Sequence, residues 1–367
     1  MTHMRTLTLL LVLTILGISS CSVNKNITSY SGKKPKKIIF LIGDGMGLTQ
    51  ISTLFLGKDN TNNFKRFKSI GFINTRSGSH KITDSAAGAT AFSCGEKTYN
   101  NAVGMNMDSA SITNIVEVFS GRKYLTGVVS TSSITHATPA SFYAHAKHRK
   151  LQYDIAQQLL KSDIDFFAGG GSEYFHKLGA DIGLYSWEID SSNSPSWTNL
   201  SFDPNKRYGF LSAPDGLPNM LTGRGDYLKS ASLAAIDYFD NKPYFLMVEG
   251  SQIDWGGHAT DYEYVYSEMQ DFDQTLGAIL DYAEKDGNTL VVVTADHETG
   301  GLSLRSQSYI DNNGNSRSDY DKVEAGFNTG GHTAALIPVF AYGPGAQSFQ
   351  GVYENNEIYN KLMALMR

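Results

Sequence analysis

The sequence predicts an α/β fold with a doubly wound, mostly parallel central sheet flanked by helices. Short, continuous apolar runs recur along the chain, which is typical of strands that are buried on both faces of a parallel sheet. Segments with apolar residues spaced by three and four alternate with these runs, which indicates amphipathic helices. The 367 residues, 41% of them hydrophobic, suffice for a large core in one big domain or two smaller ones.

The predicted elements follow one another in strand–helix alternation. Continuous apolar runs predict strands at residues 37–42, 127–130, 244–248, 290–293 and 335–342. Apolar spacing predicts helices at residues 112–119, 151–160 and 228–239, and most clearly from Val265 to Ala283. A further helix, rich in small residues, is expected to begin near Ser85. This alternation is the pattern from which the parallel sheet is inferred.

Two segments break the alternation. Residues 180–226 are rich in Ser, Asn, Asp, Pro and Trp with little periodicity, and we expect them to form a peripheral insertion. Residues 303–331 are polar and glycine-rich, and we expect a second, small insertion there. The chain contains no internal repeat and no second domain boundary, so residues 36–367 are predicted to form one domain.

The N-terminus has the features of a targeting segment. Arg5 precedes an apolar run over residues 7–18, which is too short to span a bilayer but fits a secretory signal peptide. Ser19-Ser20-Cys21 resembles a bacterial lipoprotein box, so we expect a signal peptide at residues 1–20, a lipidated Cys21 and a polar tether at residues 21–35. The protein would then lie in the periplasm or cell envelope, held to a membrane by its lipid. An ordinary signal peptide with an incidental cysteine is the alternative.

Charge and cysteine content exclude two other classes of protein. The net charge of −5 and the lack of a long basic run predict no nucleic-acid-binding surface. Cys21 and Cys94 are the two cysteines, and an exported chain that uses the first for lipidation has no internal disulfide. Cys94 lies among small residues, and we expect it to be buried packing rather than a reactive or metal-binding thiol.

Polar side chains follow the predicted strands, where an open α/β sheet binds its ligands. A single acidic residue at such a place is usually a turn former or a helix cap. Several carboxylates gathered at one edge repel one another, however, so a positive charge must hold them together. The residues are Asp44 after the first strand, His136 and Thr138 after the second, Glu249, Asp254 and His258 after the third, Asp296 and His297 after the fourth, and His332 in a later loop.

The types of these side chains indicate which cations they would bind. Imidazoles together with carboxylates, without a thiolate cluster, favour zinc or a similar transition metal. Asp254 and His258 are four residues apart, so one helical turn would place both on the same face. Glu249 and Thr138 offer only oxygen ligands, which suit a harder ion such as Mg²⁺.

Ser85 is a candidate nucleophile. It follows Asp84 at the expected start of the small-residue helix, where the helix N-terminus favours developing negative charge. Such a hydroxyl is well placed to attack an anionic centre. The alternative interpretation is that Asp84 and Ser85 only cap the helix.

Taken together and in this order, the motifs between residues 38 and 345 resemble those of the alkaline phosphatase family. The resemblance implies hydrolysis of phosphate monoesters to an alcohol and inorganic phosphate through a phosphoserine at Ser85. It implies that Arg149 binds the phosphate. It also implies two zinc ions and one magnesium ion: the first zinc on Asp254, His258 and His332, the second on Asp44, Asp296, His297 and Ser85, and magnesium on Asp44, Thr138 and Glu249.

The chain departs from the family's best-known bacterial form at two positions near the substrate. That form has Asp and Lys where this chain has His136 and Trp255. Without the lysine, we expect weaker retention of phosphate and a third metal that is lost more easily. The alternative for Trp255 is that it only packs at the mouth of the pocket. The alternative for His136 is that it is an ordinary hydrogen-bonded core residue. The segment 303–331 is short where the family often carries a larger insertion, called the crown, that contributes to dimer contacts. The sequence therefore does not decide whether the protein is a monomer or a homodimer.

Two other classes of function compete with this prediction. A phosphodiesterase, sulfatase or phosphonate hydrolase of the same superfamily is one alternative, and a non-catalytic surface lipoprotein is another. The sulfatase motif is absent, and Thr138 and Glu249 are present although diesterases of this type usually lack them. A scaffold would be expected to have lost ligands, whereas every ligand position is filled. We therefore predict a phosphatase of broad specificity, because such sites grip the phosphoryl group and leave the alcohol in solvent.

Overall fold

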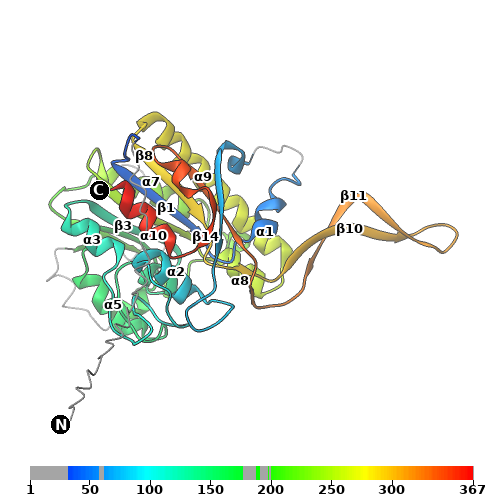
Figure 1. The fold of residues 1–367 in the computed structure, drawn as a ribbon, viewed down its shortest axis with the longest axis horizontal. Helices are drawn as coiled ribbons and strands as arrows, with labels where there is room; N and C mark the ends of the chain where they lie inside the picture. Colours follow the sequence, from blue (N-terminus) through cyan, green and yellow to red (C-terminus); the bar gives the residue numbers. More distant parts are fainter. Residues whose placement is uncertain (1–31, 58–61, 177–186, 191–196, 198–199, 367) are drawn as a thin grey trace, which may run out of the picture.

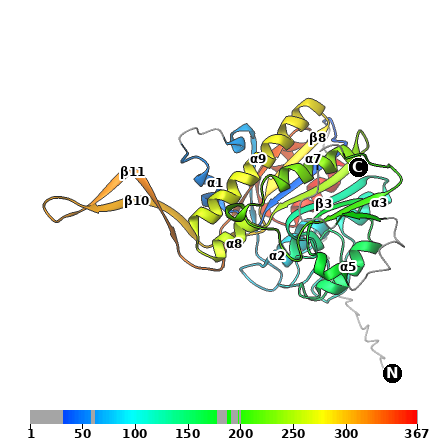
Figure 2. The same cartoon turned by 180° about the vertical axis from the view of Figure 1, so that it is seen from behind.

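The computed structural model describes residues 32–57, 62–176, 187–190, 197 and 200–366. These residues form a ten-stranded sheet in the order β14-β2-β13-β8-β1-β7-β3-β4-β6-β5. Helices cover both faces: α2 and α10 lie in front of the sheet in Figure 1, and α7 and α9 cover the face seen in Figure 2. All neighbouring strands are parallel except β13, which runs antiparallel to β2 and β8. The predicted fold class is confirmed.

The elements have the following bounds. The strands of the main sheet are β1 (Lys37–Gly43), β2 (Ser69–Asn74), β3 (Leu125–Ser133), β4 (Phe166–Gly170), β5 (Trp187–Asp190), β6 (Arg207–Leu211), β7 (Tyr244–Gly250), β8 (Thr289–Thr294), β13 (Ile337–Tyr342) and β14 (Gly351–Glu354). The principal helices are α2 (Ser85–Cys94), α3 (Ile115–Gly121), α5 (Gln152–Lys161), α7 (Tyr227–Phe239), α8 (Gln252–His258), α9 (Tyr262–Asp286) and α10 (Glu357–Leu365), with the short helices α1 (Leu48–Thr53), α4 (Ala137–Ala140) and α6 (Ser172–Phe175).

The centre of the sheet aligns the strand ends on which the site depends. Every residue of β1 and of β7 is buried, as their continuous apolar runs predict. The two strands are parallel and in register, with Ile42 opposite Glu249. The backbone N–H of Asp44 continues the ladder by donating to the carbonyl of Gly250 over 3.1 Å. The carboxyl ends of β1 and β7 therefore meet at one edge of the sheet.

Helix α2 is built mainly from small residues, and every residue in it is buried. Asp84 is its N-cap and accepts a hydrogen bond from the backbone N–H of Ala87, while Gly95 ends the helix with a left-handed φ of 75°. Cys94 is buried at the last position of the helix, and burial raises the pKa of its thiol to about 12. Its predicted role as interior packing, not as a reactive thiol, agrees with this environment.

The segment 180–226 differs from its prediction as a peripheral insertion. Strands β5 and β6 lie within it, and they extend the main sheet beyond β4 at its edge. Strands β2 and β4 were also not predicted. β2 alternates buried and more exposed positions, and β4 reads Phe-Phe-Ala-Gly-Gly, so neither contains a long apolar run. Short strands without a long apolar run leave a weak signal in a sequence.

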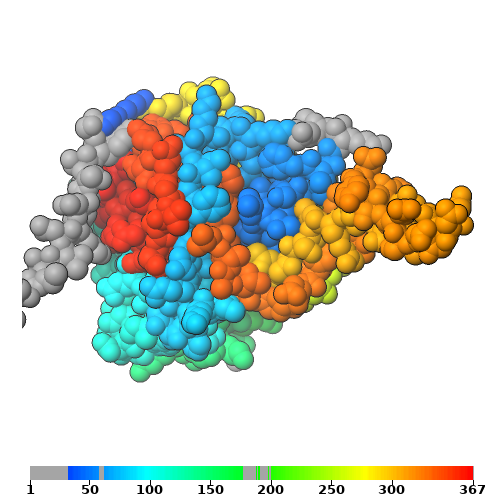
Figure 3. Space-filling view, turned by 45° about the vertical axis from the view of Figure 1, so that its right-hand side comes forward, coloured from blue at the N-terminus to red at the C-terminus, as the bar shows by residue number. Residues whose placement is uncertain are grey.

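The segment 303–331 forms a two-stranded antiparallel arm, which consists of β10 (Leu302–Ile310) and β11 (Ser316–Phe327). The arm projects from the body of the molecule, as the orange ribbon in Figure 1 and the orange atoms in Figure 3 show. Most of its side chains are exposed, among them Ile310 and Tyr320. The small insertion predicted here is therefore a hairpin that lies outside the core.

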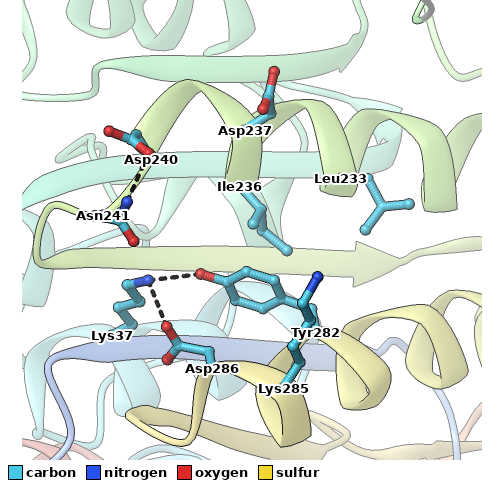
Figure 4. A pocket seen from close by; sticks show the side chains of 9 residues that line it. All are labelled: Lys37, Leu233, Ile236, Asp237, Asp240, Asn241, Tyr282, Lys285 and Asp286. Atoms are coloured by element: carbon cyan, nitrogen blue, oxygen red, sulfur yellow. Dashed lines mark hydrogen bonds and ion pairs between the residues drawn. The ribbon is translucent and has the colours of Figure 1, made fainter.

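The opposite, amino-terminal edge of the sheet carries a pocket of about 430 Å³ that is lined by both charged and apolar side chains. There the buried ammonium group of Lys37 donates hydrogen bonds of 2.8 Å to Tyr282 and to Asp286, both on α9 (Figure 4). These contacts tie the start of β1 to α9. In the described part of the chain no helix has the length and apolar character needed to cross a membrane. The predicted signal peptide, Cys21 and most of the tether lie in residues 1–31, outside the described residues.

Candidate active site

Three carboxylates meet at the carboxyl edge of the sheet. Asp44 follows β1, Glu249 lies in β7 and Asp296 follows β8, and all three side chains are fully buried. Gly45 allows this approach: its φ is +73°, and a Cβ at this position would lie 2.7 Å from the Cα of Asp254. Its backbone N–H donates to Asp296 over 3.2 Å. Glycine is needed at position 45 for both its conformation and its small size.

Two histidines beside these carboxylates share a common orientation. Nδ1 of His258 lies 2.6 Å from the carbonyl of Gly330, and Nδ1 of His332 lies 2.9 Å from the carbonyl of Thr83. A carbonyl oxygen only accepts, so both Nδ1 atoms carry the proton and both Nε2 atoms present a lone pair. Yet the two Nε2 atoms are only 3.2 Å apart. Two facing lone pairs repel, and a cation shared between them would remove the repulsion.

The ligand sets implied for the two zinc ions are each brought together. In the first set, Asp254 lies 3.4 Å from Nε2 of His258 and 3.6 Å from Nε2 of His332. Helix α8 presents Asp254 and His258 one turn apart, as their spacing predicts. In the second set, Nε2 of His297 lies 3.5 Å from Asp44 and 3.2 Å from Asp296.

The oxygens implied for the third cation are also close. Asp44, His136 and Glu249 each place one potential ligand atom within 4.8 Å of the others. Thr138, in the short helix α4 after β3, has a buried hydroxyl with no hydrogen-bond partner. The imidazole of His136 therefore lies beside the predicted oxygen set, although the resemblance does not count it as a ligand.

Unpaired buried oxygens show that these sets suit cations. Buried polar atoms normally have a hydrogen-bond partner, and an exception needs an explanation. Among the described residues that show such exceptions, five oxygen atoms lie together at this site: both Asp44 oxygens, one Asp296 oxygen, one Glu249 oxygen and the Thr138 hydroxyl. Carboxylate and hydroxyl oxygens next to imidazole nitrogens are ligands of zinc and magnesium. The residues present therefore fit the metals of the resemblance.

Electrostatics supports the same interpretation. Burial, with the nearby charges of Asp296 and Asp254, raises the pKa of Asp44 well above its usual range. Burial raises the pKa of Glu249 to about 7, and burial together with Asp254 raises that of Asp296 to about 6. Burial lowers the pKa of His297 well below its usual value, so the imidazole stays neutral. Without a cation, this group of acids favours its protonated form, and a bound cation would reverse that preference.

The candidate nucleophile lies at the edge of this cluster. Ser85 is the first residue of α2 and is buried, and its Oγ lies 3.3 Å from Nε2 of His297. Because α2 has ten residues, its N-terminus carries the positive end of a helix dipole next to that hydroxyl. Asp84, not Ser85, provides the cap of the helix. The hydroxyl of Ser85 is therefore not used in capping.

Arg149 points toward the same place. One guanidinium nitrogen donates to Asp84 over 3.1 Å, and the other donates to Nε2 of His136 over 3.1 Å. His136 accepts this bond only as a neutral imidazole, and burial and the charge of Arg149 lower its pKa to about 3. Asp84 thus orients Arg149 while its other oxygen caps α2. Sequence reasoning had assigned Asp84 only a place in the helix cap.

Trp255 lies next to His136 at this site. The two rings meet edge to face with centroids 6.1 Å apart. Gly216 packs on the indole, and a Cβ on that residue would come within 2.5 Å of the ring. Residue 216 belongs to the segment that the sequence could not connect with the site. This segment therefore holds Trp255 in place from the outside.

Three supporting residues were missed by sequence reasoning. Thr299 donates to Asp254 and lies 3.2 Å from Nδ1 of His297, so it orients a member of each zinc set. Glu298 accepts from Thr333, the neighbour of His332, and from Gln50 over 2.8 Å. Glu298 and Thr299 directly follow His297 in the sequence. This adjacency to a predicted metal ligand was the feature from which their role could have been predicted. No sequence feature indicated Gln50.

Comparison with known families gives an independent result. The family model described as alkaline phosphatase matches residues 35–187, 211–320 and 309–367. Alkaline phosphatase 3 of Bacillus subtilis is 32% identical over an alignment of 403 residues, which covers 88% of this chain and 87% of that protein. The similarity thus extends over most of both proteins.

Solved structures show the same similarity. The alkaline phosphatase of the Antarctic bacterium TAB5 is 48% identical, covers 91% of this chain and 98% of its own, and superposes with a TM-score of 0.85. A variant of that enzyme, in which aspartate replaces a histidine and magnesium is bound in the M3 site, superposes with a TM-score of 0.88. A cold-active alkaline phosphatase from a psychrophilic Shewanella is 28% identical, covers 90% of this chain and 100% of its own, and has a TM-score of 0.79.

Proposed function

The chain belongs to the alkaline phosphatase family and is a phosphomonoester hydrolase, and we propose that it acts through a phosphoserine at Ser85 beside two zinc ions and one magnesium ion. One observation carries this proposal. Imidazole lone pairs and unpaired buried carboxylates from five separate segments converge next to the hydroxyl of Ser85.

The three cations would be held by the side chains already described. Asp254, His258 and His332 would hold the first zinc, and Asp44, Asp296 and His297 would hold the second. Asp44, Glu249 and Thr138 would hold magnesium. When bound, these ions would supply positive charge for the phosphoryl oxygens and would make a hydroxyl or a water molecule more acidic. The magnesium assignment is supported by the TAB5 variant that binds this ion in its M3 site.

Ser85 would attack phosphorus in the first of two displacements. A bond forms between Oγ and phosphorus while the bond from phosphorus to the alcohol oxygen breaks, and the alcohol leaves with a proton. In the second displacement, the oxygen of a water molecule replaces Oγ on phosphorus, which yields inorganic phosphate and restores the hydroxyl. Two inversions give net retention at phosphorus. The N-terminus of α2 favours the negative charge that collects near Ser85 in both steps.

Arg149 would bind two non-bridging oxygens of the phosphoryl group. Its guanidinium is held from behind by Asp84 and from the side by His136, so the fork is oriented before the substrate arrives. Because His136 is neutral, it does not repel the positive charge of the arginine. A phosphate monoester offers the non-bridging oxygens that this fork requires, and a diester offers one fewer.

Hydrolysis of a chromogenic phosphate monoester at alkaline pH tests this function. We expect activity that a chelator abolishes and that zinc with magnesium restores. A matching diester should be hydrolysed much more slowly, since the diesterase alternative predicts the opposite ranking. A metal-loaded protein without activity on any phosphate ester would contradict the proposal and favour a surface lipoprotein without catalysis.

We further propose that the arm contacts a second copy of the chain. Its charged residues are largely paired with each other, as in Arg305–Glu324 and Arg317–Asp311. Several of its apolar side chains, in contrast, are exposed to about half or more of their surface: Tyr309, Ile310, Tyr320 and Val323. Sedimentation of the purified protein should give a dimer, and the variant Ile310→Ser/Tyr320→Ser should be monomeric. A monomeric wild type, or a variant that remains fully dimeric, would contradict this role of the arm.

We also propose that the mature protein is anchored in the cell envelope by a lipid on Cys21. This proposal is supported by the apolar run at residues 7–18 and the Ser-Ser-Cys sequence that follows it. Labelled fatty acid should enter the wild type and not Cys21→Ser, and only the wild type should partition into detergent. Equal labelling of both proteins would rule the anchor out.

A further inference from the structure

The two carboxylate oxygens of Glu249 have different surroundings. Oε2 accepts a short hydrogen bond of 2.5 Å from the hydroxyl of Ser130 and a longer one of 3.4 Å from the hydroxyl of Ser132. Oε1 is buried and has no hydrogen-bond partner. One oxygen is therefore occupied by the protein, and the other is left for a ligand.

The hydroxyl of Ser130 is itself held in one orientation. It gives its single proton to Glu249, so its two lone pairs can only accept. The backbone N–H of Ser132 donates to it over 2.9 Å, and the hydroxyls of Ser132 and Ser251 lie within donating distance at 2.8 Å and 2.9 Å. Ser130 and Glu249 face each other in the parallel register of β3 and β7, and both are fully buried. The fold thus leaves the Ser130 hydroxyl little freedom to rotate.

This arrangement decides how Glu249 can bind a cation. A charge-assisted hydrogen bond to the second oxygen fixes the orientation of the carboxylate and favours metal binding through the first oxygen. Mg²⁺ is small and requires near-octahedral geometry with single-oxygen ligands and water, whereas Ca²⁺ takes more ligands and commonly uses both oxygens of one carboxylate. A Glu249 carboxylate that is fixed in orientation and ligates through one oxygen therefore suits Mg²⁺, the smaller ion.

We propose that Ser130 is a positioning residue that restricts Glu249 to one ligating oxygen, so that the third cation site takes Mg²⁺ in preference to Ca²⁺. This inference rests on the proposed function, in which Glu249 belongs to the magnesium site. Ser251 supports it by holding Ser130. Neither serine needs to touch the metal or the substrate.

Calorimetric titration of the zinc-loaded protein with Mg²⁺ and, separately, with Ca²⁺ tests the inference. In Ser130→Ala the affinity for Mg²⁺ should fall about 10- to 100-fold, the usual effect of removing a partner from a metal ligand. The affinity for Ca²⁺ should fall less or rise, so the ratio of the two affinities should shrink. A purely structural role of Ser130 would weaken both ions alike and leave this ratio unchanged.

Ser133→Ala is the matched control. It removes a buried hydroxyl from the same strand, but Ser133 pairs with Thr135 over 2.7 Å and not with Glu249. Both affinities should stay at wild-type values. If Ser130→Ala does not fold, Ser251→Ala replaces it, because the Ser251 side chain does not cap α8. A smaller change of the affinity ratio in the same direction is expected there.

The outcomes separate this inference from the proposed function. If the zinc-loaded wild type binds Mg²⁺ and the serine variant keeps the same affinity ratio, the role of Ser130 is wrong and the magnesium site stands. If the zinc-loaded wild type binds neither ion beyond its zinc, both the magnesium site and the role of Ser130 are wrong. A reduced ratio in the variant, with an unchanged control, supports the inference.

Discussion

The hydroxyl of Ser85 lies 3.3 Å from Nε2 of His297, although 212 residues separate the two in the chain. Each arrives from a different layer of the fold: Ser85 from the N-terminus of α2, and His297 from the turn after β8. The same nitrogen faces Asp44 and Asp296. This relationship places a hydroxyl beside a candidate metal ligand set, and it leads to the first prediction.

Ser85→Ala should lower the turnover of a phosphate monoester by about 10³-fold or more, because it removes the atom that accepts the phosphoryl group. Zinc content should remain at the wild-type value, since six other side chains would hold the two proposed zinc ions. Rapid acid quenching should trap phosphoserine in the wild type only. Near-normal rates in the variant would show that phosphorus is attacked by a different group.

Arg149→Ala should weaken inhibition by inorganic phosphate roughly 10- to 100-fold, the effect of losing charge-assisted hydrogen bonds. Turnover of a monoester should fall more than that of a diester, which has fewer free oxygens for the guanidinium to bind. Arg149→Lys is the control, since it keeps the charge but cannot form the fork, and it should recover only part of the loss. Equal losses on both substrates would argue against contact with non-bridging oxygens.

His136→Asp should raise the affinity of the third site for Mg²⁺ by about tenfold, because it replaces a neutral imidazole with the oxygen ligand this ion prefers. The new carboxylate would also form an ion pair with Arg149, which lies 3.1 Å from His136. Inhibition by phosphate should then change as the arginine is drawn away from the substrate. Magnesium titration of the zinc-loaded variant measures the effect, and an unchanged affinity would remove His136 from the neighbourhood of the third cation.

Removal of metal should make stability depend on pH in a defined direction. Burial raises the folded-state pKa of Glu249 from 4.5 to about 7, and burial also raises that of Asp44 well above its usual value. A raised carboxyl pKa contributes stability below the unfolded-state pKa, and this contribution is lost as pH rises through the folded-state pKa. The metal-free protein should therefore melt several degrees lower at pH 8.5 than at pH 6.5.

The comparison of pH 6.5 with pH 8.5 also avoids the opposing effect that His297 has on stability at lower pH. The depressed pKa of His297 affects stability only below about pH 6.5, where the unfolded histidine takes up a proton. Melting of the metal-free and the zinc- and magnesium-loaded protein at both pH values measures the effect. The loaded protein should show the smaller difference, because bound cations keep the carboxylates ionised. A metal-free protein that gains stability toward pH 8.5 would contradict the carboxylate cluster.

The central strands and long helices could be predicted from the sequence because their physics is local. In β1 the continuous apolar run, and in α9 the apolar residues spaced by three and four, are the residues that the structure buries. β2, β4, β5 and β6 could not be predicted this way, because short or glycine-containing strands acquire their burial from neighbours in the sheet. The arm was expected only as a polar insertion, since its pairing depends on two strands meeting and not on a core.

The candidate site likewise has features that the local sequence predicts and features that only tertiary contacts set. The residue types after each strand, and the rule that parallel strands end at one edge, sufficed to select Asp44, Glu249, Asp296 and His297 from the sequence. Nothing local showed that Asp84 orients Arg149, that Gly216 covers Trp255, or that Ser130 occupies one oxygen of Glu249. Those roles are contacts between distant segments, and only the packing of the whole chain determines which atoms meet. The sequence by itself thus determined which ligands and which nucleophile were available. The tertiary structure decided their orientation, because hydrogen-bond directions are set by the partners that folding brings within reach.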